Sequence, residues 1–183
     1  GIPPVAKQPV PLALVRPTSD FETDIEYPAI AGLGYGVRVN DRLRLAFDLE
    51  WVEFSRYDEQ RLDIGVNSLL LPSTRIEPAW NDIWMAGVGA EWQIDPAWIL
   101  RGGYTFMETP IPSETLAPTL PDGDRHVVSM GLGYERDGHA VDVAYLYAHH
   151  DDREVEHNMN PAYNGTYDLD PSHMVALSYR YGF

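Results

Sequence analysis

The sequence of 183 residues contains no cysteine, and it has only 13 Lys and Arg residues against 28 Asp and Glu residues. Without cysteine, a disulfide framework and cysteine-ligated metal or redox chemistry are excluded. The formal net charge of −15 at pH 7 disfavours binding to nucleic acid, because a polyanion and an acidic protein repel each other. No nucleic-acid partner is therefore predicted.

Long apolar runs and helical periodicity are also absent. No run of 18 or more apolar residues occurs, so no membrane-spanning helix is predicted. This does not exclude a transmembrane β-barrel, whose strands carry a much weaker sequence signal. The first residues, GIPPVAKQPVPLALVRP, do not have the charged and apolar segments of a secretory signal. Residues 1–18 contain five prolines and are predicted to form an extended tail or loop.

What the sequence does contain is a series of short segments in which large apolar residues alternate with small or charged ones. This two-residue period predicts β-strands. The segments cover residues 29–39, 43–51, 83–94, 98–107, 126–135, 140–148 and 173–183. The alternative to a membrane barrel is a soluble β-sandwich or lipocalin-like barrel with its aromatic residues inside. The outer face of such a protein would be rich in glycine and poor in charge, which suits a surface in water badly. The pattern therefore favours a membrane barrel whose bulky residues face lipid.

Aromatic residues lie near the ends of these segments. Trp84 and Trp92 are eight residues apart on one face, which corresponds to roughly 20 Å along a barrel axis at about 3.4 Å per residue and a tilt of about 40°. That distance approaches the apolar band of about 25 Å between the aromatic girdles of outer-membrane barrels. The predicted girdle residues are Trp84, Trp92, Trp98, Tyr179, Tyr181 and Phe183.

The connections alternate between tight turns (39–41, 95–97 and 136–138) and long polar loops (58–82, 108–125 and 149–172). Outer-membrane barrels have short periplasmic turns and longer extracellular loops, and bacterial single-chain barrels have an even number of strands. A sheet of seven strands would leave unpaired backbone groups in lipid. We therefore expect residues 19–183 to be the carboxyl-terminal half of a larger barrel, whose amino-terminal half belongs to the same or another chain.

Four blocks carry a resemblance to a known family. They are RLRLAFDLEWVEFSRYDE (42–59), WNDIWMAGVGAEWQIDPAWILRGGYTFMETPIP (80–112), LPDGDRHVVSMGLGYE (120–135) and NGTYD (164–168). In order and spacing, roughly residues 20–183 resemble the last half of FadL-type outer-membrane transporters for long-chain fatty acids. The most specific piece is the pairing of the Trp-Asn-Asp-x-Trp start of one strand with the later Pro-Asp-x-Asp-Arg block.

The resemblance implies an all-β fold, namely an antiparallel transmembrane barrel of 14 strands with a hatch near its amino terminus, in the outer membrane of a Gram-negative bacterium. Expected partners are outer-membrane lipid and lipopolysaccharide, a hydrophobic ligand or detergent, and the barrel-assembly machinery, which an aromatic carboxyl terminus would address. The predicted function is passive uptake of long-chain fatty acids or similar hydrophobic compounds. The alternative is a structural or interaction barrel, such as a scaffold, adhesin or receptor. No catalytic constellation is found, so no enzyme, cofactor or metal is predicted.

Arginines provide the candidate contacts for a fatty-acid carboxylate, through charge-assisted and bidentate hydrogen bonds. Arg44 and Arg101 fall on the small-residue register, and Arg125 lies in the PDGDR block at a strand end. The alternative is that these arginines pair with acidic residues of the same register, such as Glu91 and Asp142.

Two polar loops carry apolar residues, and exposed apolar patches usually mark contact sites. The predicted lining of a hydrophobic access groove is Leu69, Leu70, Leu71, Ile111, Leu116 and Leu120. The alternative for Leu69, Leu70 and Leu71 is burial against a neighbouring loop. The segment HHDDREVEH (149–157) is interpreted as a solvated loop rather than a metal site, because loop spacing defines no ligand geometry.

Overall fold

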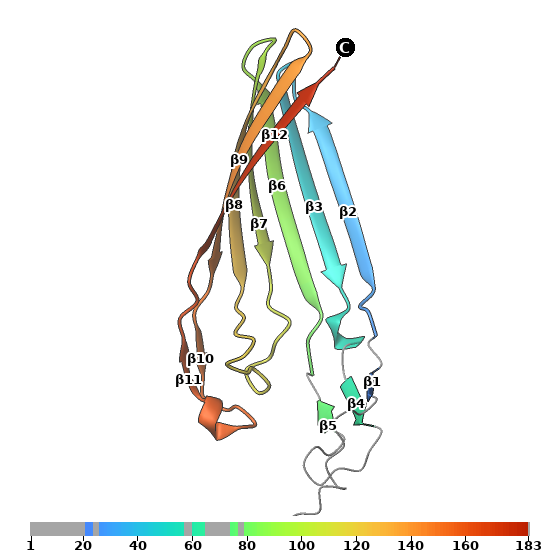
Figure 1. Ribbon diagram of the computed structural model, residues 1–183, viewed down its shortest axis with the longest axis vertical. Helices are drawn as coiled ribbons and strands as arrows, with labels where there is room; N and C mark the ends of the chain where they lie inside the picture. Colours follow the sequence, from blue (N-terminus) through green and yellow to red (C-terminus); the bar gives the residue numbers. More distant parts are fainter. Residues whose placement is uncertain (1–20, 24–25, 57–59, 65–73, 77–78, 183) are drawn as a thin grey trace, which may run out of the picture.

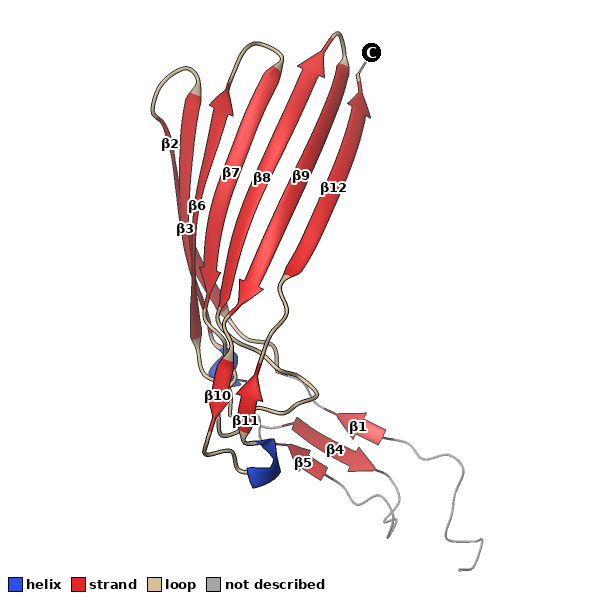
Figure 2. Cartoon of the chain, turned by 90° about the vertical axis from the view of Figure 1, so that its left-hand side faces the viewer, coloured by secondary structure: helices blue, strands red, loops and turns tan. Residues whose placement is uncertain are grey.

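Seven antiparallel strands form one curved sheet in the computed structural model, which describes residues 21–23, 26–56, 60–64, 74–76 and 79–182 (Figures 1 and 2). The seven strands pair in chain order, each with the one that follows it, so the sheet is an up-and-down meander. The strands are β2 (Ile30–Arg38), β3 (Leu43–Val52), β6 (Ile83–Gln93), β7 (Trp98–Met107), β8 (Arg125–Arg136), β9 (His139–His150) and β12 (Ser172–Tyr181). The seven predicted strands are confirmed.

Shorter elements lie in the long connections. Strands β1 (Phe21–Thr23), β4 (Gln60–Ile64) and β5 (Thr74–Ile76) form a small sheet, and β10 (Arg153–Val155) pairs with β11 (Gly165–Tyr167). The described residues also form two single 3₁₀ turns, η2 (Phe54–Arg56) and η3 (Pro161–Tyr163). These elements were not predicted, because three to five residues are too few to establish a period. Among the described residues, no helix has the length and apolar character needed to cross a membrane.

The connections separate by length between the two ends of the sheet (Figure 1). The β2–β3, β6–β7 and β8–β9 turns lie at one end, here called the short-turn end, and the long connections lie at the opposite, long-loop end. The turns are held locally. The Asn40 side chain accepts hydrogen bonds from two backbone N–H groups at 2.8 and 2.9 Å, and Asp95 does the same at 2.8 and 3.0 Å. Asp137 and Gly138 both have positive φ, as a tight two-residue hairpin requires.

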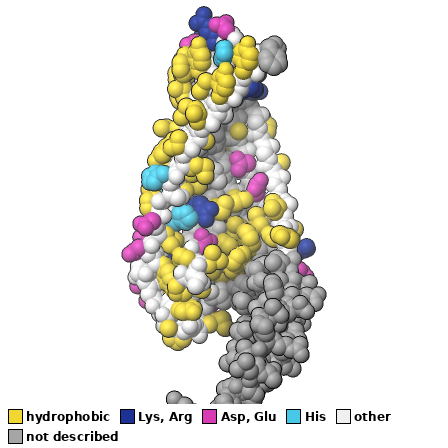
Figure 3. All heavy atoms as spheres, viewed as in Figure 1, with side chains coloured by type: hydrophobic (Ala, Val, Ile, Leu, Met, Phe, Trp, Pro, Cys, Tyr) yellow, Lys and Arg dark blue, Asp and Glu magenta, His cyan; other side chains and the backbone are white. Residues whose placement is uncertain are grey.

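The two faces of the sheet differ sharply. The small-residue face carries Gly34, Gly36, Ala46, Gly87, Gly89, Gly103, Ser129, Gly131, Ala144 and Ala176, which the strand register places on one side. The opposite, aromatic face carries large apolar side chains that are 38% to 77% exposed, from Tyr104 to Leu33. Figure 3 shows hydrophobic side chains along the whole length of the described surface. A sheet in water would cover such a face, so its exposure agrees with a surface that meets lipid.

Both edge strands, β2 and β12, run toward the short-turn end, because a meander with an odd number of strands ends in the direction in which it began (Figure 1). Within the described part of the chain, neither edge strand has a partner on its outer side. Joining β2 directly to β12, from the same or a second copy, would pair parallel strands. Antiparallel closure throughout therefore requires an odd number of additional strands.

The β8–β9 turn generates the first prediction. Gly138 has φ of 81°, and a Cβ there would lie 2.5 Å from the carbonyl oxygen of Gly182. Gly138→Ala should therefore lower the free energy of unfolding in detergent by about 1–2 kcal/mol. Asp137→Asn is the matched control, because asparagine tolerates the same left-handed conformation, and its stability should be unchanged. Equal urea midpoints for the Gly138→Ala variant and the wild type would contradict this account.

Candidate functional site

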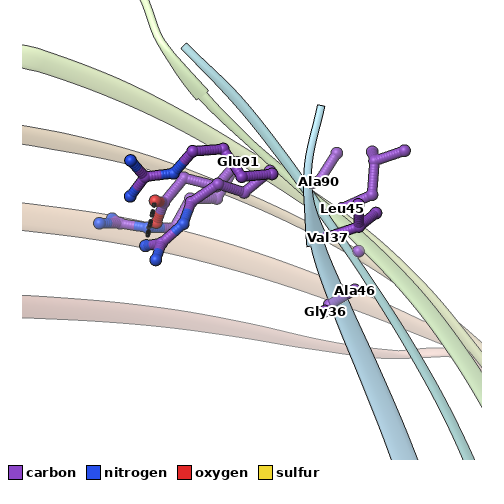
Figure 4. A pocket seen from close by; sticks show the side chains of 11 residues that line it. Gly36, Val37, Leu45, Ala46, Ala90 and Glu91 are labelled. Carbon is purple, nitrogen blue, oxygen red and sulfur yellow. Dashed lines mark hydrogen bonds and ion pairs between the residues drawn. The ribbon is translucent and has the colours of Figure 1, made fainter. Parts of the chain in front are cut away.

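A charged row crosses the small-residue face near the short-turn end. The register aligns Arg38, Arg44, Glu91 and Arg101 on four successive strands, β2, β3, β6 and β7. Arg101 donates from Nε to Glu91 Oε2 at 2.9 Å, and Arg44 Nη1 lies 3.6 Å from Glu91 Oε1. Figure 4 shows Glu91 among the guanidinium groups on one side of the sheet, while Val37 and Leu45 point to the other side. The Glu91 carboxylate thus interacts with two guanidinium groups, those of Arg44 and Arg101.

The charged row continues past β8 to β9, although β8 contributes no charged side chain to it. Arg101 Nη1 on β7 donates to Asp142 Oδ1 on β9 at 2.9 Å, although β8 lies between these strands. The bridge is possible because β8 presents Gly131 and Gly133 at this level. A Cβ on Gly133 would lie 2.6 Å from Asp142 Oδ1 and 3.0 Å from Arg101 Nη1. The glycine therefore leaves the space in which the ion pair forms.

The charge balance of this row is positive, in a chain whose net charge is −15. Three cations, Arg38, Arg44 and Arg101, face two carboxylates, those of Glu91 and Asp142. Arg101 is paired twice, as the alternative interpretation expected. The Arg44 side chain is 62% exposed, and among the described residues Arg38 makes no ion pair. The β2–β3 side of the row therefore holds the cations that remain open to a ligand.

A hollow of about 590 Å³ lies beside these cations. Its lining combines Arg38, Arg44, Glu91 and Arg101 with small residues, among them Gly36, Ala46 and Gly89. Side chains without bulk leave apolar space next to positive charge. An amphiphile with an anionic head and an apolar tail fits this combination chemically.

Arg125 lies on the same face at the long-loop end, at the start of β8. Its Nη2 lies 3.8 Å from Asp122 Oδ1, and its Nε is buried without a hydrogen-bond partner. The register places Met107 and then Met85 beside it. Arg125 is thus separated from Arg101 by six residues along the strands, and the structure does not bring the three predicted contacts together.

The long-loop end contains a small packed core of its own. Ile111, Leu116 and Val155 are buried, with Trp80 and Tyr167 against them. These residues come from loop 108–124, β10, β11 and the segment before β6. The loops therefore pack on one another at the rim of the sheet.

Two polar side chains tie this core together. Arg153 donates to the Ile111 carbonyl oxygen at 2.7 Å and to Ser113 Oγ at 2.8 Å. The Asn158 amide donates to the carbonyl oxygens of Ser113 and Leu116, both at 2.8 Å. The segment 149–157 was interpreted as solvated, and this is wrong for Arg153 and Val155. The alternation Arg-Glu-Val was too short to indicate burial.

The predicted groove residues divide into three groups. Ile111 and Leu116 are 6% and 0% exposed, so the structure gives them a packing role in the loop core. Leu120 is 54% exposed and available for contact. Leu69, Leu70 and Leu71 lie outside the described residues. Binding of a hydrophobic ligand by these residues stays a prediction.

The predicted girdle residues lie at both ends of the aromatic face. Trp84 is at the long-loop end, directly opposite Trp51 in the register. Trp92, Trp98, Tyr179 and Tyr181 are at the short-turn end, where the rings of Trp98 and Tyr134 are 4.7 Å apart. Phe183 lies outside the described residues. Contact of these rings with the membrane interface stays a prediction.

In the part of the chain that the structure describes, no group of three His, Asp or Glu side chains is arranged to hold a metal ion. The structural contacts of Gly133, Arg153 and Asn158 were missed from the sequence. Gly133 had one available signal, because it follows Gly131 on the face that also carries Arg101.

Gly133→Ala tests the ion-pair bridge. The new methyl group would displace Asp142 or Arg101, and the loss of a half-exposed ion pair should lower the free energy of unfolding by about 1 kcal/mol. Gly131→Ala is the matched control, since its nearest neighbours would lie at ordinary contact distances of 3.6 Å or more. Urea unfolding in detergent measures both variants. Equal destabilisation by the two substitutions would refute a specific role for Gly133.

Comparisons with known proteins can now be set beside this geometry. The description of the family that matches residues 5–183 is "outer membrane protein transport protein (OMPP1/FadL/TodX)". A protein of Neisseria meningitidis serogroup B described as "putative outer membrane protein" is 31% identical over 63% of this chain and 26% of its own length. The long-chain fatty acid transport protein of Salmonella typhi is 23% identical over 77% of this chain and 32% of its own length.

Solved structures agree with the fold. A crystal structure of a Pseudomonas aeruginosa FadL homologue has a TM-score of 0.67 and 26% identity, over 84% of this chain and 35% of that one. The Pseudomonas putida toluene transporter TodX has a TM-score of 0.57 and 21% identity, over 90% of this chain and 37% of that one. The latter likeness shows the fold alone. The chain thus spans about a third of the length of these proteins or less.

Proposed function

The chain belongs to the outer membrane protein transport family (OMPP1/FadL/TodX), and from that premise we propose that it forms the wall of a channel for passive uptake of long-chain fatty acids or similar hydrophobic compounds. The observation that carries the proposal is the wall itself. One face of the sheet exposes large apolar side chains. The other face combines small residues, a hollow of about 590 Å³ and cations that remain open to a ligand. No residue is assigned a catalytic role.

The channel is completed by further strands. In this proposal residues 19–183 are the carboxyl-terminal half of the barrel, and seven more strands close a barrel of 14. Seven is an odd number, as the parallel direction of β2 and β12 demands. These strands belong to the same or another chain.

The cations of the charged row distinguish an amphiphile from a neutral hydrocarbon. Arg44 contacts Glu91 only at 3.6 Å, and Glu91 already accepts a hydrogen bond from Arg101 at 2.9 Å. A carboxylate ligand would give Arg44 a full partner, whereas toluene would not. This argument favours an anionic amphiphile such as a fatty acid. Arg125 would offer a second contact, at the loop end.

A second candidate function is an interaction barrel without transport. The packed loop core, with the hydrogen bonds of Arg153 and Asn158, gives the long-loop end a defined surface that a macromolecular partner could recognise. A partner that co-purifies in detergent, together with a lumen empty of amphiphile, would favour this function.

Uptake of labelled oleate tests transport. A strain that lacks the parent gene should take up oleate more slowly than one that expresses the full-length protein. Mass spectrometry of lipid extracted from the purified full-length protein should reveal a bound amphiphile. The absence of both an uptake defect and a bound amphiphile would reject the proposal.

Arg44→Gln tests the carboxylate contact in the same assay. Removing one open cation should reduce oleate uptake several-fold, because a charge-assisted contact to a side chain as exposed as that of Arg44 contributes about 1 kcal/mol. Uptake of methyl oleate, which has no charge, should be unchanged and serves as the matched ligand. Equal loss for both ligands would show that the variant damages the channel rather than a carboxylate site.

A further inference from the structure

Three of the six histidines lie on the aromatic face near the long-loop end. His126, His149 and His173 belong to the adjacent strands β8, β9 and β12. His126 and His149 are direct partners in the register, and His173 is opposite Tyr147. The side chains of His126 and His149 are 35% and 48% exposed. We call these three residues the histidine patch.

Two of these imidazoles are held by tyrosines in the same way. Tyr104 Oη lies 2.7 Å from His126 Nδ1, and Tyr145 Oη lies 2.7 Å from His173 Nδ1. In each pair, the tyrosine is directly opposite a residue that follows the histidine by two positions. The two side chains therefore meet diagonally across neighbouring strands. With Nδ1 occupied, each ring presents Nε2 as its remaining polar atom.

Asp151 lies beside the Nε2 atoms of two of these rings. Its Oδ1 lies 3.5 Å from His126 Nε2 and 3.7 Å from His149 Nε2. A carboxylate only accepts hydrogen bonds, so its position favours the tautomer in which His126 carries hydrogen on Nε2 and accepts the Tyr104 hydroxyl hydrogen at Nδ1. Both distances to Asp151 exceed those of a good hydrogen bond. Asp151 therefore does not engage either Nε2 atom in a hydrogen bond of good geometry.

The surroundings of the patch are otherwise aromatic. His126 stacks on Tyr104 and contacts Phe106, and His173 lies against Tyr145 and Tyr147. Asp151 is the one charged group that makes a contact with the patch in the described part of the chain. The patch also lies where the apolar face gives way to polar loops, which is the depth of lipid headgroups for a wall of this kind.

We propose that the histidine patch binds a phosphate-bearing lipid headgroup at the long-loop end of the wall. Phosphate oxygens are strong acceptors for the Nε2–H groups, and protonation of the imidazoles adds a charge-assisted contact. Asp151 competes with the phosphate for the same donors and repels its charge. The occupant is the membrane's own lipid, since the acyl chains would lie on the adjoining apolar face. The proposal does not depend on transport.

Lipid binding to the full-length, delipidated protein in detergent tests this site. Native mass spectrometry would compare lipid A with its dephosphorylated form at pH 6. The wild type should bind lipid A at least about fivefold more tightly. His126→Phe, His149→Phe and His173→Phe combined keep an aromatic surface and should abolish that preference. His139→Phe is the matched control, because His139 makes the same contact with Tyr179 at 2.8 Å at the opposite end and should leave the preference unchanged.

Asp151→Asn is a second, independent variant that retains all three histidines. It should increase the preference for lipid A, because it removes the competing charge. An unchanged or weaker preference would overturn the proposal, even if the triple variant failed to fold. Retention of the preference by a folded triple variant would also overturn it. Displacement of lipid A by millimolar inorganic phosphate would overturn the assignment to a lipid.

Discussion

Backbone hydrogen bonding without water is the constraint on which this wall depends. Lipid offers no partner for an N–H or C=O group, so each strand must satisfy its groups on its neighbours. The seven-stranded meander does so along every internal strand, and only β2 and β12 retain open sides within the described residues. Their common direction then determines how the wall can close. The requirement for an odd number of further strands follows from pairing alone, before any side chain is considered.

Side chains then give the two faces opposite tasks. The aromatic face leaves its large apolar side chains exposed, as a surface that meets lipid would. The small-residue face keeps space free and places its charges where glycines leave room for them. Gly133 illustrates the relation, since the bridge from Arg101 to Asp142 passes over the position where a Cβ would otherwise stand. Stability and an open interior are thus provided by the same small residues.

The long-loop end works by a different principle. There the chain leaves the sheet, and its backbone groups must be satisfied by local contacts. Arg153 and Asn158 donate to carbonyl oxygens of the proline-rich loop, and Leu116 is completely buried beneath them. The rim is therefore an ordered structure, in which Leu120 is exposed and Arg125 lies 3.8 Å from Asp122. The nearby histidine patch belongs to the outer surface of the wall rather than to its interior.

The amino-acid order alone settles the strands and their faces, because a period of two is a local property of the chain. Segments such as 98–107 and 43–51 match β7 and β3 within a residue. The separation of short turns from long loops follows from the same alternation. Family resemblance on four blocks supplied the fold class, and the comparisons agree with it.

Only the tertiary structure decides which charges meet and which apolar residues are buried. The shared register named Asp142 only as one of several possible partners. The fold decides that Arg101 contacts it, since the two residues are 41 positions apart and on non-adjacent strands. Ile111 and Leu116 resemble an exposed patch in the sequence, and only their packing against Val155 places them inside. The physical reason is common to both cases. Alternation specifies the side of the sheet on which a residue lies, whereas pairing and burial depend on the shape of the surface opposite it.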